Sequence, residues 1–494
     1  MVRVAIIGAG IAGIACSIRL ALKGFEVDVY EAQRTPGGKI ASFTQDSFRF
    51  DRGPSLFTMP ELVEELFALA HQDPRAYLSY KRLPVACRYF YEDKTILTAY
   101  TDAKQFGQEV SGKLGIAAEV VEHYLARSGR LFELTRKTFL ERSLHQWPTY
   151  ASSDARQLLM RIFQLPLMSS LNQVNTAQLK HPKLVQLFNR FATYQGANPY
   201  TAAGMLQMIP HLEHNIGTFF PQGGTYSIIQ QLFKLSKQLG VRYHFSTLVE
   251  EILVSQGSTQ GIRIGTEKIP TDVVVSNMDV VATYQRLLPC AQLPRQFMQQ
   301  GRSSSALIFY WGMDAVLQEL SLHNIFFSTS YQQEFEAIFR HQRIADDPTV
   351  YVHVSAKENA TDAPVGQENW FVMINVPADQ GQRWDELVVQ ARTNVLGKLT
   401  RMLATAIEPL IVSESIWDPR CIAADTLAHQ GAIYGADTSS QLAVFRRHPN
   451  FSWQFKGLYF CGGTVHPGGG IPLCLFSAKI VAELIEQAYF GPNR

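Results

Sequence analysis

A glycine-rich turn between a short strand and a helix constrains this chain more than any other feature. Residues 2–7 form a short run rich in β-branched residues, and residues 14–22 follow with a helical pattern. Gly8, Gly10 and Gly13 stand between them in a G-x-G-x-x-G arrangement. The first glycine permits a tight turn, the second lets a phosphate approach the backbone, and the third lets the helix pack closely on the strand. We therefore predict a βαβ unit whose helix N-terminus faces an anionic ligand.

An acidic residue completes this pattern. A second strand is expected at residues 26–30 and ends at Glu31, roughly 20 residues after the first glycine. A carboxylate at this place can accept hydrogen bonds from both ribose hydroxyls, and it disfavours a 2′-phosphate. The spacing predicts an adenine dinucleotide, FAD or NAD in preference to NADP. The alternative is a decayed site or a coincidental glycine turn.

A second glycine turn lies near the other end of the chain. Residues 461–472 read CGGTVHPGGGIP and run into a predicted helix at 473–487. This helix N-terminus can face the negatively charged pole of a flavin if the start of the chain binds the dinucleotide. We interpret His466 inside the turn as a packing or capping residue, with an acid or base role as the alternative.

Composition limits the remaining possibilities. The chain has 494 residues, 46% hydrophobic and 18% charged, with a net charge of +2. This balance excludes disorder and a nucleic-acid partner, and it is compatible with an apolar substrate. Six scattered cysteines, Cys290 among them, form no C-x-x-C pair, so we predict no metal site and a reducing, cytoplasmic compartment. The uncharged run at 457–478 contains too many glycines and prolines for a membrane span.

The order of these patterns predicts an α/β fold, with α+β insertions, in which the nucleotide-binding part is discontinuous. We expect that part at residues 1–76, 216–290 and 416–494, and substrate-binding parts at 77–215 and 291–415. A second strand-turn-helix signal around Gly223 and Gly224 marks the middle piece. Thr58 and Glu61 predict a capping box at the start of a helix, and residues 120–187 are expected to be mainly helical.

Several motifs together resemble one family. They are the N-terminal motif with Glu31, the Gly38-Lys39 turn, and residues 51–54, 220–225, 276–279 and 466–472. Over nearly the full length the chain is similar to bacterial-type carotenoid desaturases, the phytoene desaturase family. The resemblance implies the glutathione reductase and monoamine oxidase type of fold, a Rossmann-like FAD-binding domain with an inserted substrate- and membrane-binding domain. Residues 465–472 and 211–214 resemble most closely the desaturases of hydroxylated acyclic carotenoids, the 3,4-desaturase branch.

The resemblance also implies which residues contact FAD. The ADP half is expected to contact Gly8, Gly10, Ala12, Gly13, Glu31 and Val249. The middle of FAD is expected to contact Gly38, Lys39, Ser55 and Leu56. The flavin is expected to lie near Asn277, Gly463, Gly470, Ile471 and Pro472. Two of these depart from the family pattern. Lys39 stands where many relatives have arginine and loses the bidentate phosphate contact, and Gly463 stands where many flavoproteins of this fold have an acid. We assign no catalytic base.

The implied substrate predicts a membrane partner. Removing a forty-carbon chain from water at ~0.8 kcal/mol per carbon gives roughly 32 kcal/mol, above the ~20 kcal/mol ceiling of non-covalent affinity. A carotenoid is therefore expected to arrive from membrane lipid, and the protein to associate peripherally, as a monotopic protein. The Met- and Phe-rich section at 158–208 is the candidate contact, with a core role as the alternative. The sequence leaves the oligomeric state open.

Other functions remain open at this point. A flavin amine or porphyrinogen oxidase shares the two dinucleotide ends, and a carotenoid isomerase without net redox chemistry shares the cofactor. A prenyl-binding escort protein uses a related shell without FAD, but Glu31 and the terminal glycine turn argue against it.

Overall fold

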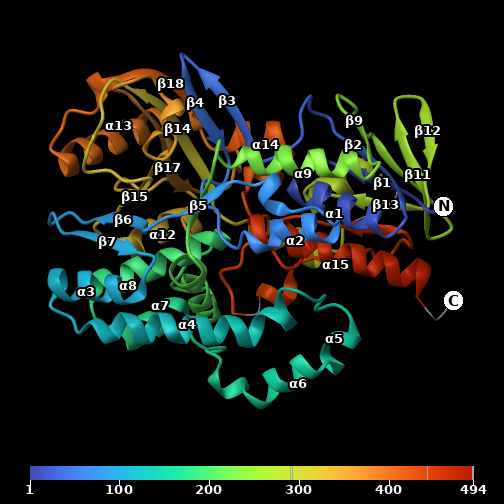
Figure 1. Cartoon of the computed structure of the whole chain (residues 1–494), viewed down its shortest axis with the longest axis horizontal. Coiled ribbons are helices and arrows are strands. Elements are labelled where there is room, and N and C mark those ends of the chain that lie inside the picture. The colour runs from blue at the N-terminus through green and yellow to red at the C-terminus, as the bar shows by residue number, and fades with distance from the viewer. Residues whose placement is uncertain (290, 292, 442, 492–494) are drawn as a thin grey trace.

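Three distant parts of the chain share one parallel sheet (Figure 1). The computed structural model describes residues 1–289, 291, 293–441 and 443–491, so Cys290 and the expected segment ends at 290 and 494 lie outside it. The strand order is β19 (Leu458–Phe460), β13 (Val273–Ser276), β1 (Arg3–Ile7), β2 (Glu26–Tyr30) and β9 (Arg242–His244). Because all of these strands are parallel, their carboxyl ends meet at one edge, where open α/β sheets bind ligands.

Side-chain alternation buries both faces of this sheet. In β1, Val4 and Ile6 pack with the helices, whereas Ala5 and Ile7 pack on the other side. The helices are α1 (Ile11–Leu22), α2 (Glu61–Leu69), α9 (Tyr226–Gln238) and α15 (Ile471–Phe490). The other face is covered by an antiparallel sheet of β10 (Glu251–Ser255), β11 (Ser258–Ile264) and β12 (Glu267–Pro270). This arrangement confirms the predicted α/β fold.

A second, mixed sheet forms the other half of the molecule. Its order is β18 (Ile411–Trp417), β14 (Ser305–Met313), β17 (Glu368–Val376), β16 (Val350–Val354), β15 (His323–Phe326), β6 (Val85–Phe90) and β7 (Ile96–Tyr100). Strand β18 crosses position 415, where we placed the end of a substrate segment. One face packs against α13 (Trp384–Leu403) through Phe309 and Trp370. The opposite face turns toward the parallel sheet and forms a wall of the site.

Helices complete the substrate half. Helices α3 (Ala103–Leu114), α4 (Ala118–Phe139), α7 (Leu171–Leu179) and α8 (Pro182–Asn189) lie beside β6 and β7, with α5 (Trp147–Ala151) and α6 (Ser153–Met160) at the lower edge of Figure 1. The predominance of helix in 120–187 agrees with the sequence pattern. Smaller elements are β3 (Ala41–Gln45), β4 (Phe48–Arg52), β5 (Tyr80–Arg82), β8 (Phe219–Pro221), α10 (Val280–Ala282), α11 (Arg295–Met298), α12 (Tyr331–Phe339) and α14 (Pro419–Thr426).

One predicted helix start is wrong. Helix α2 begins at Glu61 with Pro60 at the N-cap and without a side-chain cap from the described residues. Pro60 has helical dihedral angles, which suit the proline ring. Thr58 lies two positions before the N-cap, too far from the helix to cap it, and it lines the site instead. Within the described ranges, no helix is long and apolar enough to cross a bilayer.

Candidate cofactor and substrate site

A cavity of about 740 Å³ lies between the carboxyl edge of the parallel sheet and the face of the mixed sheet. All the predicted cofactor residues line this cavity except Gly13, which lies beneath it. A Cβ at Gly13 would stand 2.2 Å from the Gly8 carbonyl oxygen, so the helix and strand approach closely at this residue. The structure thus brings residues from both chain ends to one place. Their contacts with FAD stay a prediction.

The first glycine turn has the geometry of a phosphate site. Gly8 has φ +99°, which favours glycine. The Asn277 amide donates a hydrogen bond to the Gly8 carbonyl at 3.2 Å, and a Cβ on Gly10 would lie 2.8 Å from that amide nitrogen. Helix α1 receives no side-chain cap from the described residues and has no acid in its first turn. Its N-terminal N–H groups are therefore available to an anion.

Glu31 is held rigidly at the end of β2. Its carboxylate accepts hydrogen bonds from the backbone N–H of Ala9 at 2.7 Å and from that of Gln33 at 2.9 Å. The side chain is buried, and each oxygen retains acceptor capacity. The carboxylate is thus oriented along the cavity wall, where it can accept from ribose hydroxyls.

Asn277 joins the two glycine turns. It follows β13, the strand between β1 and β19. Its side-chain oxygen would lie 2.8 Å from a Cβ on Gly462, so the C-terminal turn also needs glycine. Helix α15 then begins after Gly470, which has φ +101°, and neither a side-chain cap from the described residues nor an acid in its first turn occupies its N-terminus. Two uncapped helix N-termini therefore face one cavity.

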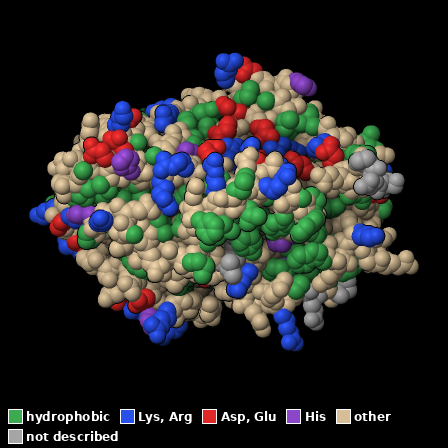
Figure 2. Space-filling model, turned by 90° about the horizontal axis from the view of Figure 1, so that it is seen from below, with side chains coloured by type: hydrophobic (Ala, Val, Ile, Leu, Met, Phe, Trp, Pro, Cys, Tyr) green, Lys and Arg blue, Asp and Glu red, His purple; other side chains and the backbone are tan. Residues whose placement is uncertain are grey.

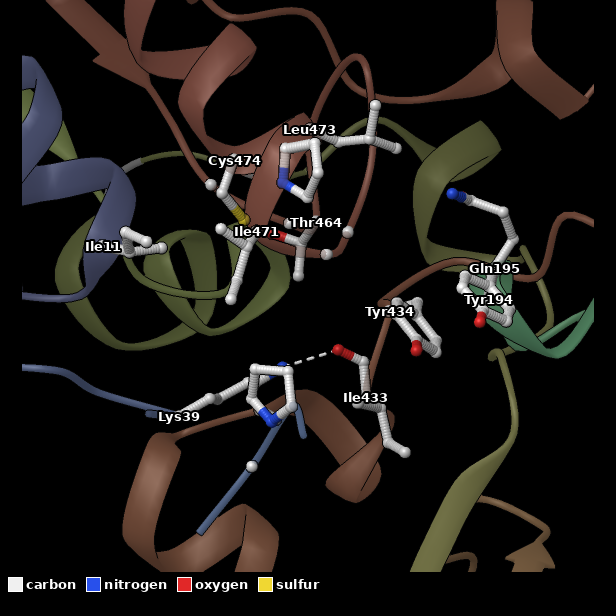
Figure 3. Close-up of a pocket in the computed structure, with 18 of the residues that line it drawn as sticks. Ile11, Lys39, Tyr194, Gln195, Ile433, Tyr434, Thr464, Ile471, Leu473 and Cys474 are labelled. Carbon is white, nitrogen blue, oxygen red and sulfur yellow. Dashed lines mark hydrogen bonds between the residues drawn. The ribbon is translucent and has the colours of Figure 1, made fainter. Parts of the chain in front are cut away.

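Two cations, the half-buried Lys39 and the buried Arg447, add to this positive potential. Lys39 donates to the Ile433 carbonyl at 2.8 Å, across the cavity from Ile471 and Cys474 (Figure 3), and burial lowers its pKa. Arg447 donates to the carbonyl of Gly463 at 3.1 Å, and burial lowers its pKa to about 10. Neither cation has a carboxylate within ion-pair distance among the described residues.

This donor set fits FAD. A pyrophosphate is anionic and matches the α1 terminus and Lys39, and the electron-rich end of a flavin matches the α15 terminus and Arg447. Sequence reasoning missed Arg447. It stands in no motif, and its donors reach the Tyr434 carbonyl and the Gln195 side chain, which come from two separate segments.

His466 does not act at this cavity. It is buried, and its Nε2–H donates to the Arg142 carbonyl at 2.9 Å. Burial lowers its pKa to about 3, so the ring is neutral in ordinary buffers. This environment agrees with the packing interpretation.

Apolar side chains line much of the remaining cavity. They come from the mixed sheet, from α4 and from the segment after α8, and they include Ile308, Phe371, Phe132, Phe139, Met205 and Met208. The alternation that buries Phe309 against α13 turns Ile308 toward the cavity. The substrate side of the site is therefore suited to an apolar chain.

Known proteins identify the family. A family model described as flavin containing amine oxidoreductase matches residues 11–486. This chain belongs to that family. FAD is thus its cofactor, and the protein is an FAD-dependent oxidoreductase.

A 1-hydroxycarotenoid 3,4-desaturase of Flavobacterium sp. (strain P99-3) is 44% identical over 99% of both chains. A 4,4′-diaponeurosporene oxygenase of Staphylococcus aureus (strain MSSA476) is 31% identical over 97% of both. These relatives confirm the resemblance to carotenoid desaturases.

Solved structures support the fold. An oxidoreductase from Methanosarcina mazei superposes with a TM-score of 0.65 at 15% identity, covering 97% of this chain and 100% of the other. A triple mutant of putrescine oxidase gives 0.63 at 14% identity, covering 99% of each. At these identities the likeness establishes the fold alone.

Proposed function

We propose that this chain is an FAD-dependent desaturase of hydroxylated acyclic carotenoids. The observation that carries the proposal is its 44% identity to a 1-hydroxycarotenoid 3,4-desaturase over 99% of both chains. The apolar wall that continues from the cofactor residues supports it. Bound FAD supplies an acceptor for hydride from the carbon chain.

The protein's own contribution is binding, alignment and the exclusion of water. A polyene offers no polar group along its length, so Ile308, Phe371 and Met208 position it by shape. An apolar wall at these positions also keeps water from the reacting carbons. No side chain is assigned to remove the accompanying proton.

The charges in the cavity disfavour an amine substrate. A carboxylate that is already paired with a cation binds an ammonium group weakly, and two of those that line the cavity are paired in this way. Glu213 pairs with Arg190, and Asp425 pairs with Arg52. Asp279 accepts hydrogen bonds from backbone N–H groups, as Glu31 does. This arrangement favours a neutral substrate over the amines of the wider family.

We also infer that the protein is cytoplasmic and associates peripherally with a membrane, from which it takes its substrate. Figure 2 shows hydrophobic side chains gathered on the underside, the side of α5 and α6 in Figure 1. Exposed apolar residues in and beside these helices are Trp147, Tyr150, Leu159, Met160, Phe163 and Met168. Phe163 is 98% exposed, and burying such side chains in lipid is favourable.

The cavity reaches this surface. Leu167 lines the cavity and directly precedes the exposed Met168. Phe445 also lines it, is 44% exposed, and packs edge-on against Phe139 with ring centroids 5.9 Å apart. Arg156 and Arg161 are exposed near the patch and can contact anionic headgroups. These positions support direct transfer of a carotenoid from lipid to cavity.

Pigment analysis tests the proposed activity. The protein is expressed in a host that makes 1-hydroxylated acyclic carotenoids, and extracts are compared with those of the same host without it. We expect a product that has lost two hydrogens and absorbs at longer wavelength. A product that gains oxygen would favour oxygenase activity, and unchanged pigments would contradict the proposal.

A further inference from the structure

One part of the cavity is polar, in contrast to its apolar wall. Ser55, which is predicted to contact the middle of FAD, is hydrogen bonded to the Tyr351 hydroxyl at 2.7 Å. That hydroxyl is also hydrogen bonded to His323 Nδ1 at 2.7 Å. All three residues line the cavity. A continuous chain of hydrogen bonds thus runs from the expected cofactor position to the imidazole of His323.

The far side of this imidazole is unsatisfied. His323 is 3% exposed, and its Nε2 has no hydrogen-bond partner in the described part of the chain. A buried polar atom without a partner is costly. Because this residue lines the cavity, a bound molecule can supply the missing partner.

The charges around His323 select a neutral partner. Arg190 and Glu213 line the same cavity and are buried, and an Arg190 Nη2–H donates to both Glu213 oxygens at 3.2 Å. The same nitrogen donates to the Tyr89 hydroxyl at 2.7 Å. The pair therefore compensates its own charges. Burial, the neighbouring His353 and the Arg190 cation hold the pKa of His323 well below its usual range, so its ring is neutral.

We propose that this polar end of the cavity binds the terminal hydroxyl of the carotenoid and that His323 Nε2 is its hydrogen-bond partner. The inference rests on the proposed function and names the residues that select the substrate within it. His323 acts as a specificity-determining residue, with Tyr351 fixing its ring.

The site requires a neutral group that can form a hydrogen bond with His323 Nε2, and a hydroxyl meets both requirements. It can donate to Nε2 in one imidazole tautomer and accept from Nε2–H in the other, so either tautomer is satisfied. In the relative's name the hydroxyl is on carbon 1 and the oxidised bond joins carbons 3 and 4. The hydroxyl therefore lies close to the reacting bond, and its partner must lie close to the flavin. His323 lies near the expected cofactor position, because its ring is only two hydrogen bonds from Ser55, a predicted contact of the middle of FAD.

A pair of substrates and a pair of variants test this inference. The substrates are a 1-hydroxylated acyclic carotenoid and the matching hydrocarbon, each in the same liposomes. The variants are His323→Leu and, as the matched control, His353→Leu. His353 faces His323 across the strand pair with ring centroids 5.1 Å apart, is buried, and also has an unpartnered Nε2. It is not among the described residues that line the cavity.

The readout is the preference for the hydroxylated carotenoid over the hydrocarbon. It is measured as the ratio of the two kcat/KM values and as the ratio of the two affinities, which are obtained from quenching of tryptophan fluorescence. We expect His323→Leu to reduce this preference by about 10- to 100-fold, with the hydrocarbon bound as well as before. The control is expected to keep the wild-type ratio. An unchanged ratio in His323→Leu overturns the inference.

A second variant covers the case in which His323→Leu fails to fold or to retain FAD. Tyr351→Phe keeps the imidazole but removes the hydroxyl that orients it, and we expect a loss of preference of about threefold to tenfold; an unchanged ratio again refutes the inference. If wild-type protein oxidises neither carotenoid, the proposed function fails. The affinity ratio still decides whether His323 recognises the hydroxyl.

Discussion

Replacing Glu31 with glutamine tests the dinucleotide site with a change of very few atoms. The carboxylate accepts two backbone hydrogen bonds, one to each oxygen, from Ala9 at 2.7 Å and Gln33 at 2.9 Å. A glutamine amide has a single acceptor oxygen, so its NH₂ group must face one of these N–H donors. One donor in a buried turn would lose its partner, at a cost of roughly 1–3 kcal/mol in the free energy of unfolding.

The same change weakens the predicted contact with FAD. A carboxylate makes charge-assisted bonds to ribose hydroxyls, and each is worth roughly 1 kcal/mol more than a neutral bond. Losing this advantage at two hydroxyls gives about 2 kcal/mol, which is about a 30-fold rise in Kd. Titrating apoprotein with FAD while following flavin fluorescence measures this Kd. Glu267→Gln, on the exposed strand β12, is the control. An unchanged Kd in Glu31→Gln would refute the assignment.

Three further perturbations have defined outcomes. Arg447→Met removes a buried cation beside Gly463, so we expect the Kd for FAD to rise about tenfold. Flavin retention after gel filtration equal to that of the wild type would argue against a role of Arg447 in binding FAD. Leu159→Ser combined with Phe163→Ser should reduce flotation of the protein with anionic liposomes severalfold while its flavin content stays unchanged. Undiminished flotation would exclude this patch as the membrane contact. His466 has a pKa of about 3 when folded and about 6.5 when unfolded. Unfolding therefore takes up a proton as pH falls below 6.5, and stability falls with it. At pH 5 this amounts to about 2 kcal/mol. Urea unfolding at pH 7 and pH 5 should show a smaller acid loss in His466→Gln than in wild type, and equal losses would contradict the low pKa.

The glycine turns were predictable because their requirement is local. A tight turn before a helix needs glycine at Gly8 whatever the rest of the chain does, and the spacing to Glu31 follows from the length of one βαβ unit. The same holds for Gly470, whose positive φ precedes α15. Local sequence was a poorer guide at Thr58, because Pro60 took the N-cap and moved the helix start.

The polar end of the cavity could not be predicted in this way. Ser55 and Tyr351 form a hydrogen bond although they are 296 residues apart in the chain, and no periodicity links them. Arg447 is similar, since only the folded chain brings it beside Gly463. The sequence indicated that a dinucleotide binds, whereas the selection of substrate depends on tertiary contacts between segments that carry no motif.

Anaerobic mixing of the holoprotein with a 1-hydroxylated carotenoid in liposomes tests the central claim most directly. If FAD lies between the two glycine turns and faces the substrate cavity, the yellow absorbance of oxidised flavin should be lost in step with formation of the longer polyene, one double bond for each flavin. Flavin that stays yellow with the carotenoid but is bleached by a simple amine would contradict the account.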